Sequence, residues 1–206
     1  MDIIIFAAIA IFILYKLYSV LGQDVGFKAD KAMDIEDIDL EKKPVFHKKT
    51  TLKQAHEQDL AKIQELQPEF SHEEFLDGAT EAFKMILNAL NTGDRQSLEF
   101  LLTPDLYKVF EKVIVTREKN NEAWENELIR IQSAEITQTE IQRDNQIFVT
   151  VKFISEQILS ILDKGGNLID GDPNQIETIT DIWTFTRNAS SPDPNWFLSK
   201  TTHGND

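Results

Sequence analysis

Residues 70–93 read FSHEEFLDGATEAFKMILNALNTG and have the pattern of an amphipathic helix with marked ends. Ser71 and Glu74 form a capping box, in which the serine hydroxyl accepts a hydrogen bond from the Glu74 amide and the glutamate reaches back. Phe70 and Phe75 occupy the flanking hydrophobic-staple positions. Large apolar residues then recur at helical spacing until Asn91-Thr92-Gly93, a typical helix stop. We therefore expect a helix over this stretch.

Two shorter helices are expected next. Asp94 can cap one, and Thr103-Pro104 supplies a cap followed by a proline at the first helical position of the other. The residues expected to face inward are Leu98, Leu101 and Leu102 in the first, and Leu106, Val109, Phe110, Val113 and Ile114 in the second.

Beyond about Glu127 the apolar period changes from helical to two, which is typical of strands. Four strands are expected, marked by Ile129 and Ile131; Ile147 to Phe153; Ile179, Trp183 and Phe185; and Trp196 and Leu198. Residues 143–145, 164–173 and 188–195 between them are turn material. Helices followed by strands predict an α+β domain, with an antiparallel sheet whose one face the helices cover.

Upstream, residues 52–67 carry apolar side chains at roughly helical spacing before Pro68, which predicts an amphipathic helix that docks on the domain. Residues 23–51 are rich in charge and short of large apolar residues, as in a flexible tether. The tether's lysines at 42, 43, 48 and 49 are interpreted as a solvated charge run rather than a lipid contact, because an acidic run lies just upstream.

Residues 1–22 begin with an apolar run that we interpret as an uncleaved transmembrane anchor. The 19 residues from Ile3 to Leu21 contain one charge, and as a helix they would reach ~28 Å, about the thickness of the hydrocarbon core. The residues expected to contact the bilayer are Ile3, Phe6, Ile9, Phe12, Tyr15, Lys16 and Tyr18. Among them the two tyrosines suit the headgroup level, and the lysine can extend its ammonium to the interface.

A cleaved signal peptide and a helix buried in an oligomer are the alternatives to the anchor. A signal peptide would have a positive segment before the run and a small-residue cleavage site after it, and neither is present. Lysines lie only on the C-terminal side, so the positive-inside bias predicts a cytoplasmic domain. A transit peptide would be rich in arginine, which makes a bacterial inner membrane the simpler location.

Two tryptophan motifs carry a family resemblance. Trp183-Thr184-Phe185-Thr186-Arg187 and Pro194-Asn195-Trp196-Phe197-Leu198, together with the helical pattern from Phe70 to Phe110, resemble the Tim44-like domain family over about residues 65–206. That family comprises the bacterial TimA adaptors and the C-terminal half of the mitochondrial inner-membrane import adaptor. The folded domain is accordingly assigned to residues 68–206.

The resemblance implies a cone-shaped fold, in which a curved antiparallel sheet wraps around helices as in nuclear-transport-factor-two-like or cystatin-like domains. It also implies a non-enzymatic, membrane-anchored adaptor or scaffold near protein translocation or membrane-protein quality control. Its partner would be a translocase component or a chaperone. Three alternatives stay open: a periplasmic single-anchor scaffold of a secretion system, a small-ligand-binding cone, and a mitochondrial inner-membrane protein facing the matrix.

Charge and composition narrow the function further. A formal net charge of −14 repels nucleic acid and anionic headgroups, so no nucleic-acid partner is expected. The absence of cysteine excludes a thiol nucleophile and thiolate metal sites. The four histidines form no metal-ligand spacing, His203 lies in the expected tail, and Asp170-Gly171-Asp172 is interpreted as a turn. We expect no catalytic residue, metal or cofactor, and the sequence leaves the oligomeric state open.

Between sheet and helices, a cone can enclose a pocket. The candidate lining residues, for which buried core is the simpler interpretation of the aromatic side chains, are Phe83, Phe153, Asp181, Trp183, Phe185 and Trp196. Among them Asp181 is the ionisable residue that shares strand parity with Trp183.

Overall fold

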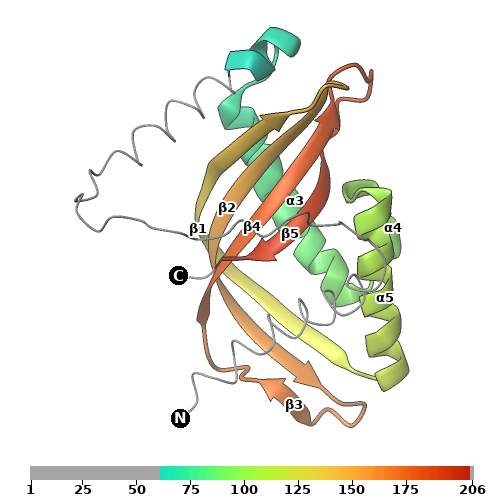
Figure 1. Ribbon diagram of the computed structural model, residues 1–206. Coiled ribbons are helices and arrows are strands. Elements are labelled where there is room, and N and C mark those ends of the chain that lie inside the picture. Colours follow the sequence, from blue (N-terminus) through green and yellow to red (C-terminus); the bar gives the residue numbers. More distant parts are fainter. Residues whose placement is uncertain (1–60, 205–206) are drawn as a thin grey trace, which may run out of the picture.

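The computed structural model describes residues 61–204 (Figure 1). The predicted anchor at 1–22 and tether at 23–51 lie outside the described residues. Of the helix predicted at 52–67, the described part is helical over 61–66, and its Ile63 is fully buried. Within residues 61–204, no helix combines the length and the apolar character that a membrane crossing needs.

Three helices follow: α3 (His72–Thr92), α4 (Arg95–Leu101) and α5 (Pro104–Asn120). The predicted caps of the first two are confirmed. The Ser71 hydroxyl accepts from the Glu74 amide at 3.3 Å, and the Asp94 carboxylate accepts from the Ser97 amide at 3.1 Å. Gly93 ends α3 with φ 73°, a left-handed conformation that glycine adopts without strain.

The start of α5 differs from the expectation in one respect. Pro104 opens the helix as predicted, but the Thr103 side chain makes no capping hydrogen bond. Thr103 is held through its backbone instead, because its amide donates to the Leu198 carbonyl at 2.9 Å. This bond ties the start of α5 to the sheet.

The sheet is antiparallel and has five strands, not the predicted four. These are β1 (Ala123–Ile141), β2 (Gln146–Leu162), β3 (Leu168–Gly171), β4 (Glu177–Asn188) and β5 (Phe197–His203). Their order is β1-β2-β4-β5, with β3 paired to the end of β2. Pairing to β2 turns part of the predicted 164–173 loop into a strand, and Gly171, at φ 83°, lies too close to the Leu159 carbonyl for a Cβ.

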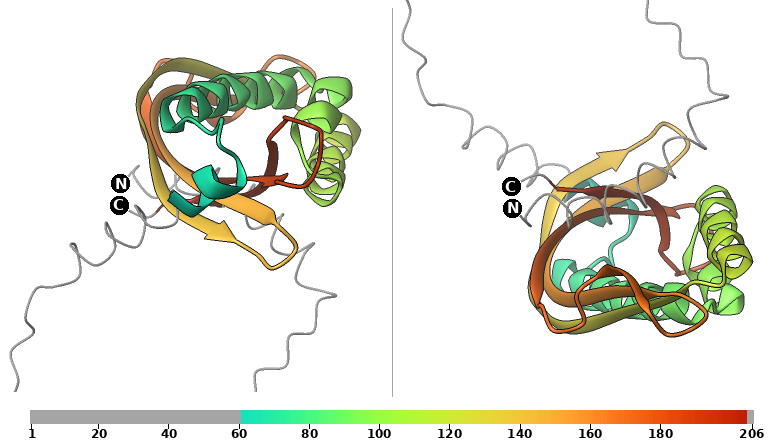
Figure 2. Two further views of the ribbon diagram at one scale, coloured as in Figure 1. Left: turned by 90° about the horizontal axis from the view of Figure 1, so that it is seen from above. Right: turned by 90° about the horizontal axis from the view of Figure 1, so that it is seen from below.

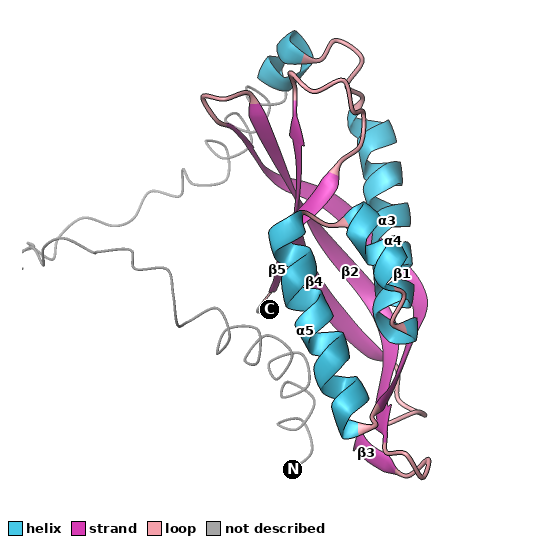
Figure 3. Ribbon diagram, turned by 90° about the vertical axis from the view of Figure 1, so that its right-hand side faces the viewer, coloured by secondary structure: helices cyan, strands magenta, loops and turns pink. Residues whose placement is uncertain are grey.

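The sheet curves around α3, while α4 and α5 stand across its open side (Figure 2). Three register shifts along β1, where the strand carries extra residues relative to β2, account for much of this bending. All three helices lie on the same, concave face of the sheet (Figure 3). The predicted α+β class, with helices on one face of an antiparallel sheet, is confirmed.

The core lies between α3 and this concave face. Along β2 every second side chain from Ile147 to Phe153 points inward and is fully buried. Phe83 of α3 stacks on Phe153 and also packs against Trp183, with ring centroids 4.5 Å apart in both pairs. This cluster fixes α3 against the sheet.

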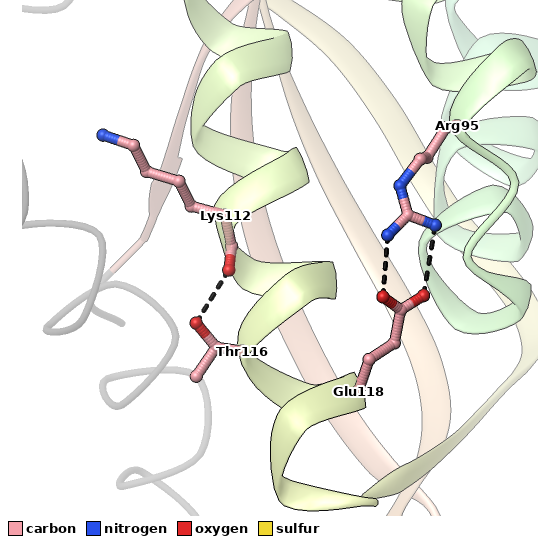
Figure 4. Close-up of polar contacts among 4 residues, drawn as sticks. All are labelled: Arg95, Lys112, Thr116 and Glu118. Carbon is pink, nitrogen blue, oxygen red and sulfur yellow. Dashed lines mark hydrogen bonds and ion pairs between the residues drawn. The ribbon is translucent and has the colours of Figure 1, made fainter.

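A surface ion pair joins the two shorter helices (Figure 4). The Arg95 guanidinium donates two hydrogen bonds to the Glu118 carboxylate, at 2.8 and 3.1 Å. In α5, the Thr116 hydroxyl donates to the Lys112 carbonyl one turn back, and the Lys112 side chain extends away from this contact. The ion pair orients α4 against α5, although an exposed pair of this kind contributes little to stability.

Candidate functional site

The structure divides the candidate pocket residues among three places. Phe83 and Phe153 are core residues with no exposed surface. Phe185 and Trp196 line a wide groove at the start of α3. Asp181 and Trp183 line a smaller cavity near the other end of the concave face. The single pocket considered from sequence is therefore two separate hollows.

The wide hollow has a volume of about 720 Å³ and is called the aromatic groove here. It lies between the first half of α3, the segment that leads into α3, and the loop between β4 and β5. Its aromatic floor consists of Phe70, Phe75, Phe185 and Trp196. The staple residues of the capping box thus help to build the groove as well as the helix end.

The floor is a connected set of rings. Phe75 meets Trp196 edge-on at 4.9 Å between centroids and meets Phe185 edge-on at 6.0 Å. Phe70 packs on Phe75 at 5.8 Å and on Trp196 at 6.0 Å. Edge-on and tilted pairs of this kind are a favoured aromatic geometry, so the rings hold one another in place.

The rim of the aromatic groove is acidic. Glu69, Glu74 and Glu81 line it with exposed side chains. The Arg187 guanidinium also lines the groove, but it donates to the Gln67 side chain and to the Asp193 carbonyl, each at 3.2 Å. The groove therefore combines an apolar floor with a net negative edge, which suits an apolar segment flanked by cationic side chains.

The smaller hollow has a volume of about 150 Å³ and is called the polar cavity here. Its helix side is mostly apolar, with Ile86 and Leu90 of α3 and Phe110 of α5, next to Asn91. Its sheet side draws on four strands and is mixed. The polar or hydrogen-bonding residues there are Trp124, Asn126, Gln157, Ser160, Asp181, Thr201 and His203, and the apolar ones include Leu159, Ile161 and Ile179. The Trp124 Nε1 and the Asn126 Oδ1 are buried there without a hydrogen-bond partner in the described part of the chain.

Asp181 faces this cavity, on the same side of β4 as Trp183. Burial raises the pKa of its carboxyl from 3.8 to about 6. In the sheet, Asp181 pairs with Phe153 on one side and His203 on the other. His203 is thus the final residue of β5, and its assignment to the tail was wrong because Ser199 to His203 carry no apolar signal for a strand.

Sequence reasoning missed the β1 contribution to the cavity. Trp124 and Asn126 precede the point at which the first strand was expected to begin, yet β1 starts at Ala123. The alternation of the charged Glu125 and Glu127 with Trp124 and Leu128 is the sequence signal that could have placed them.

Neither hollow has the donor set of a metal centre. Over residues 61–204, no group of three His, Asp or Glu side chains is placed to hold an ion. The groove offers aromatic area and carboxylates at its edge, whereas the cavity offers isolated hydrogen-bond donors and acceptors.

Comparison with known proteins gives a family match. The sequence model of the Tim44-like domain matches residues 56–203. An uncharacterized protein of Rickettsia prowazekii, RP434, is 28% identical over 130 residues, which cover 63% of this chain and 51% of that protein. The Arabidopsis thaliana mitochondrial import inner membrane translocase subunit TIM44-1 is 23% identical over 179 residues, which cover 83% of this chain and 38% of that subunit.

The chain thus spans about half or less of the length of these curated relatives. Among solved structures, the intermembrane space region of the chloroplast protein ARC6 is similar, with a TM-score of 0.43 and 10% identity. The similarity covers 62% of this chain and 95% of that one.

Proposed function

This chain belongs to the Tim44-like domain family, and we propose that it is a non-enzymatic, membrane-held adaptor that presents the aromatic groove to a protein partner of a translocase. The similarity to a mitochondrial import translocase subunit supports a role in protein transport and an association with an inner membrane. We also assign the curved sheet with its helices to the cone-shaped, nuclear-transport-factor-two-like or cystatin-like class.

The observation that carries the protein-binding role is the aromatic groove itself. Of the four aromatic rings in its floor, Phe70 and Trp196 are half-buried, and the Met85 side chain that also lines the groove is 51% exposed. Apolar area left open to water in this way, with a charged edge, is typical of protein interaction sites. Methionine in addition adapts its shape to different partners.

The acidic edge narrows the partner's chemistry. Glu69 and Glu74 would attract lysine or arginine side chains, while the floor would bury apolar ones; Glu81 already accepts a hydrogen bond from the Lys84 ammonium. The partner segment is therefore an amphipathic one with a basic face, contributed by a translocase component or by a chaperone.

A crosslinking experiment tests the groove as the partner site. A photo-crosslinking amino acid at Met85, in the full chain in its native membrane, should give a discrete protein adduct. The same amino acid at Lys112, which is also exposed and central in a helix, is the matched control. Equal adducts from both positions, or none from Met85, would contradict the proposal.

The membrane part of the proposal rests on the sequence of residues 1–22. In it, the apolar run anchors the chain in a bacterial inner membrane, the bilayer is a lipid partner through that segment alone, and the domain faces the cytoplasm. The lysines that follow the run support this orientation. A mitochondrial inner membrane with the domain on the matrix side is the alternative location.

Topology can be measured directly because the chain has no cysteine. A single cysteine at Lys164, an exposed position of the turn before β3, should react with an impermeant thiol reagent only after permeabilisation. A cysteine at Asp2 should react in intact cells. The reverse pattern would instead support the periplasmic scaffold of a secretion system, which is the second candidate.

A further inference from the structure

The concave face of the sheet changes character along its length. Towards one end its inward residues are apolar, as at Val151 and Phe153 on β2 and at Phe185 on β4. Towards the other end, β2 presents Ser155 and Gln157, and the other strands change in the same direction. Around the polar cavity, which extends over several residues along the strands, they present Trp124 and Asn126 on β1, Asp181 on β4, and Thr201 and His203 on β5. The apolar strand residues that also line it are Leu159, Ile161, Ile179 and Trp183.

The change from apolar to polar inward residues does not favour folding, because it buries polar groups. Ser155 and Gln157 are fully or almost fully buried, and they satisfy each other through a hydrogen bond of 2.8 Å. The Trp124 Nε1–H and the Asn126 Oδ1 have no such partner within the described chain, although each atom is buried. Burying a polar group without a hydrogen bond destabilises a fold, so two such atoms on β1 that line one cavity indicate a ligand.

The two unpartnered groups are held in defined positions. They lie two residues apart on one face of β1, about 7 Å along the strand. The Arg117 guanidinium lies over the Trp124 ring, 5.6 Å from its centroid, and holds the indole in place. The Asn91 side chain donates to the Asn126 backbone carbonyl, which fixes that part of β1 to the end of α3.

The opposite wall limits the size and shape of the ligand. Ile86, Leu90 and Phe110 give most of this wall an apolar surface, and Asn91 is its polar residue. The volume of about 150 Å³ is close to that of a cavity that takes one benzene ring. A flat ring that packs on the helices while its substituents reach β1 fits these limits.

We propose that the polar cavity is a binding site for a neutral, single-ring molecule that carries a hydrogen-bond acceptor for Trp124 and a donor for Asn126. An aromatic amide and a ring amide have this chemistry, because carbonyl and N–H lie next to each other. Asp181 and His203 pair with each other farther along the sheet and line the same cavity. The site is separate from the aromatic groove and does not depend on the adaptor role.

The test uses benzamide and 2-pyridone as probes on the full chain in lipid nanodiscs. The chain has three tryptophans, so 5-fluorotryptophan labelling gives three ¹⁹F signals, which single Trp→Phe variants assign. The Trp124 signal should shift saturably with at least one probe, with a dissociation constant on the order of a millimolar. The Trp196 signal, from the aromatic groove, is the internal control and should not move with it.

Toluene is the matched apolar probe, since it has the ring but neither hydrogen-bonding group. It should bind at least tenfold more weakly than the better amide, because it leaves both buried groups unpaired. Absence of a saturable Trp124 shift with both amides would overturn the proposal. Equal affinity for toluene would also overturn it, because the cavity would then recognise only apolar shape.

Two variants separate binding from folding. Asn126→Leu removes the unpaired acceptor, and it should weaken amide binding at least tenfold while the melting temperature stays equal or rises. Asn126→Asp retains an acceptor and should retain measurable binding. If Asn126→Leu binds the amides as tightly as the unchanged protein does, the hydrogen-bonding role assigned to this residue is wrong.

Discussion

The aromatic groove and the polar cavity lie on the same concave face but reverse the usual placement of side chains. In the groove, the Phe70 and Trp196 rings remain partly in contact with water, and the charges stand at the edge. In the cavity, polar atoms of the strands are withdrawn from water among apolar side chains of the helices and the sheet. An open apolar surface is suited to a macromolecule, whereas enclosed donors and acceptors are suited to a small molecule.

Helix α3 forms a wall of both hollows. Ala82 and Met85 face the groove, and Ile86 and Leu87 face the cavity. Between them, Phe83 is packed between Phe153 and Trp183. One well-anchored helix therefore gives both hollows their shape, and a change at its anchor should affect them together.

Phe83→Ala should have the largest effect. It removes a fully buried ring that contacts two other rings, so it should lower the free energy of unfolding by about 3–5 kcal/mol. Urea denaturation followed by tryptophan fluorescence would measure the loss. Lys84→Ala, at the exposed neighbouring position, is the control and should change stability by less than about 0.5 kcal/mol. A loss below about 1 kcal/mol for Phe83→Ala would mean that α3 is not anchored by this ring.

Asp181→Asn should have the second largest effect, and in the opposite direction. Burial raises the pKa of Asp181 to about 6, so the folded protein binds a proton more tightly than the unfolded chain does. Protonation therefore stabilises the fold as pH falls from 6 to 4, and this stabilisation is lost as pH rises through 6. At pH 7.5 the ionised carboxyl is unfavourable, and Asp181→Asn should stabilise the fold by about 2 kcal/mol.

The pH dependence gives this prediction its control. The stability difference between the unchanged protein and Asp181→Asn should shrink as pH falls from 7.5 to 4. His203 pairs with Asp181 across the sheet, so the same stability difference is also measured in a His203→Gln background. Glu177, which precedes Asp181 on β4, is the same in both proteins of each comparison. A difference that stays constant with pH would show that the Asp181 carboxyl keeps an ordinary pKa.

The two hollows also differ in how far the sequence predicted them. Phe70, Phe75 and the Trp196 motif stood out because capping boxes and aromatic strand residues are local signals. The expected inward parity of Asp181 was also correct, since alternation along one strand is local too. The pairing of residues between strands could not be predicted. Asp181 lies opposite His203 because of the strand register, and register depends on pairing between residues that are distant in the sequence.

The errors in the strands have the same origin. β3 has four residues between turns rich in glycine and aspartate, and it is a strand only because the end of β2 extends far enough to pair with it. The early start of β1 likewise depends on pairing between Trp124 and Ile161. Neither Trp124 nor Asn126 could be assigned to a site before that pairing was known.

Ser71→Ala should have an intermediate effect, confined to the groove end of α3. The Ser71 hydroxyl accepts from the Glu74 amide, and loss of such a cap lowers stability by about 1 kcal/mol. Hydrogen exchange of the amides in the first turn of α3 should become faster, while exchange near the polar cavity stays unchanged. Ser71→Asp keeps a capping acceptor and should restore slow exchange. If Ser71→Ala accelerates exchange equally along α3, the two ends of the helix are not independent.

Met85→Ser should have the smallest effect on stability and a large effect on partner binding. The side chain is 51% exposed, so the free energy of unfolding should change by less than about 0.5 kcal/mol. Because Met85 lies in the aromatic groove, the loss of its apolar area should reduce the partner adduct formed from a crosslinker at a neighbouring groove position, Glu81. Phe100→Ser is the matched control, since Phe100 on α4 is 74% exposed but does not line the groove. If Phe100→Ser abolishes the adduct and Met85→Ser does not, the interaction surface lies on α4 and not in the groove. The contrast between an open protein site and an enclosed ligand site would then rest on the polar cavity alone.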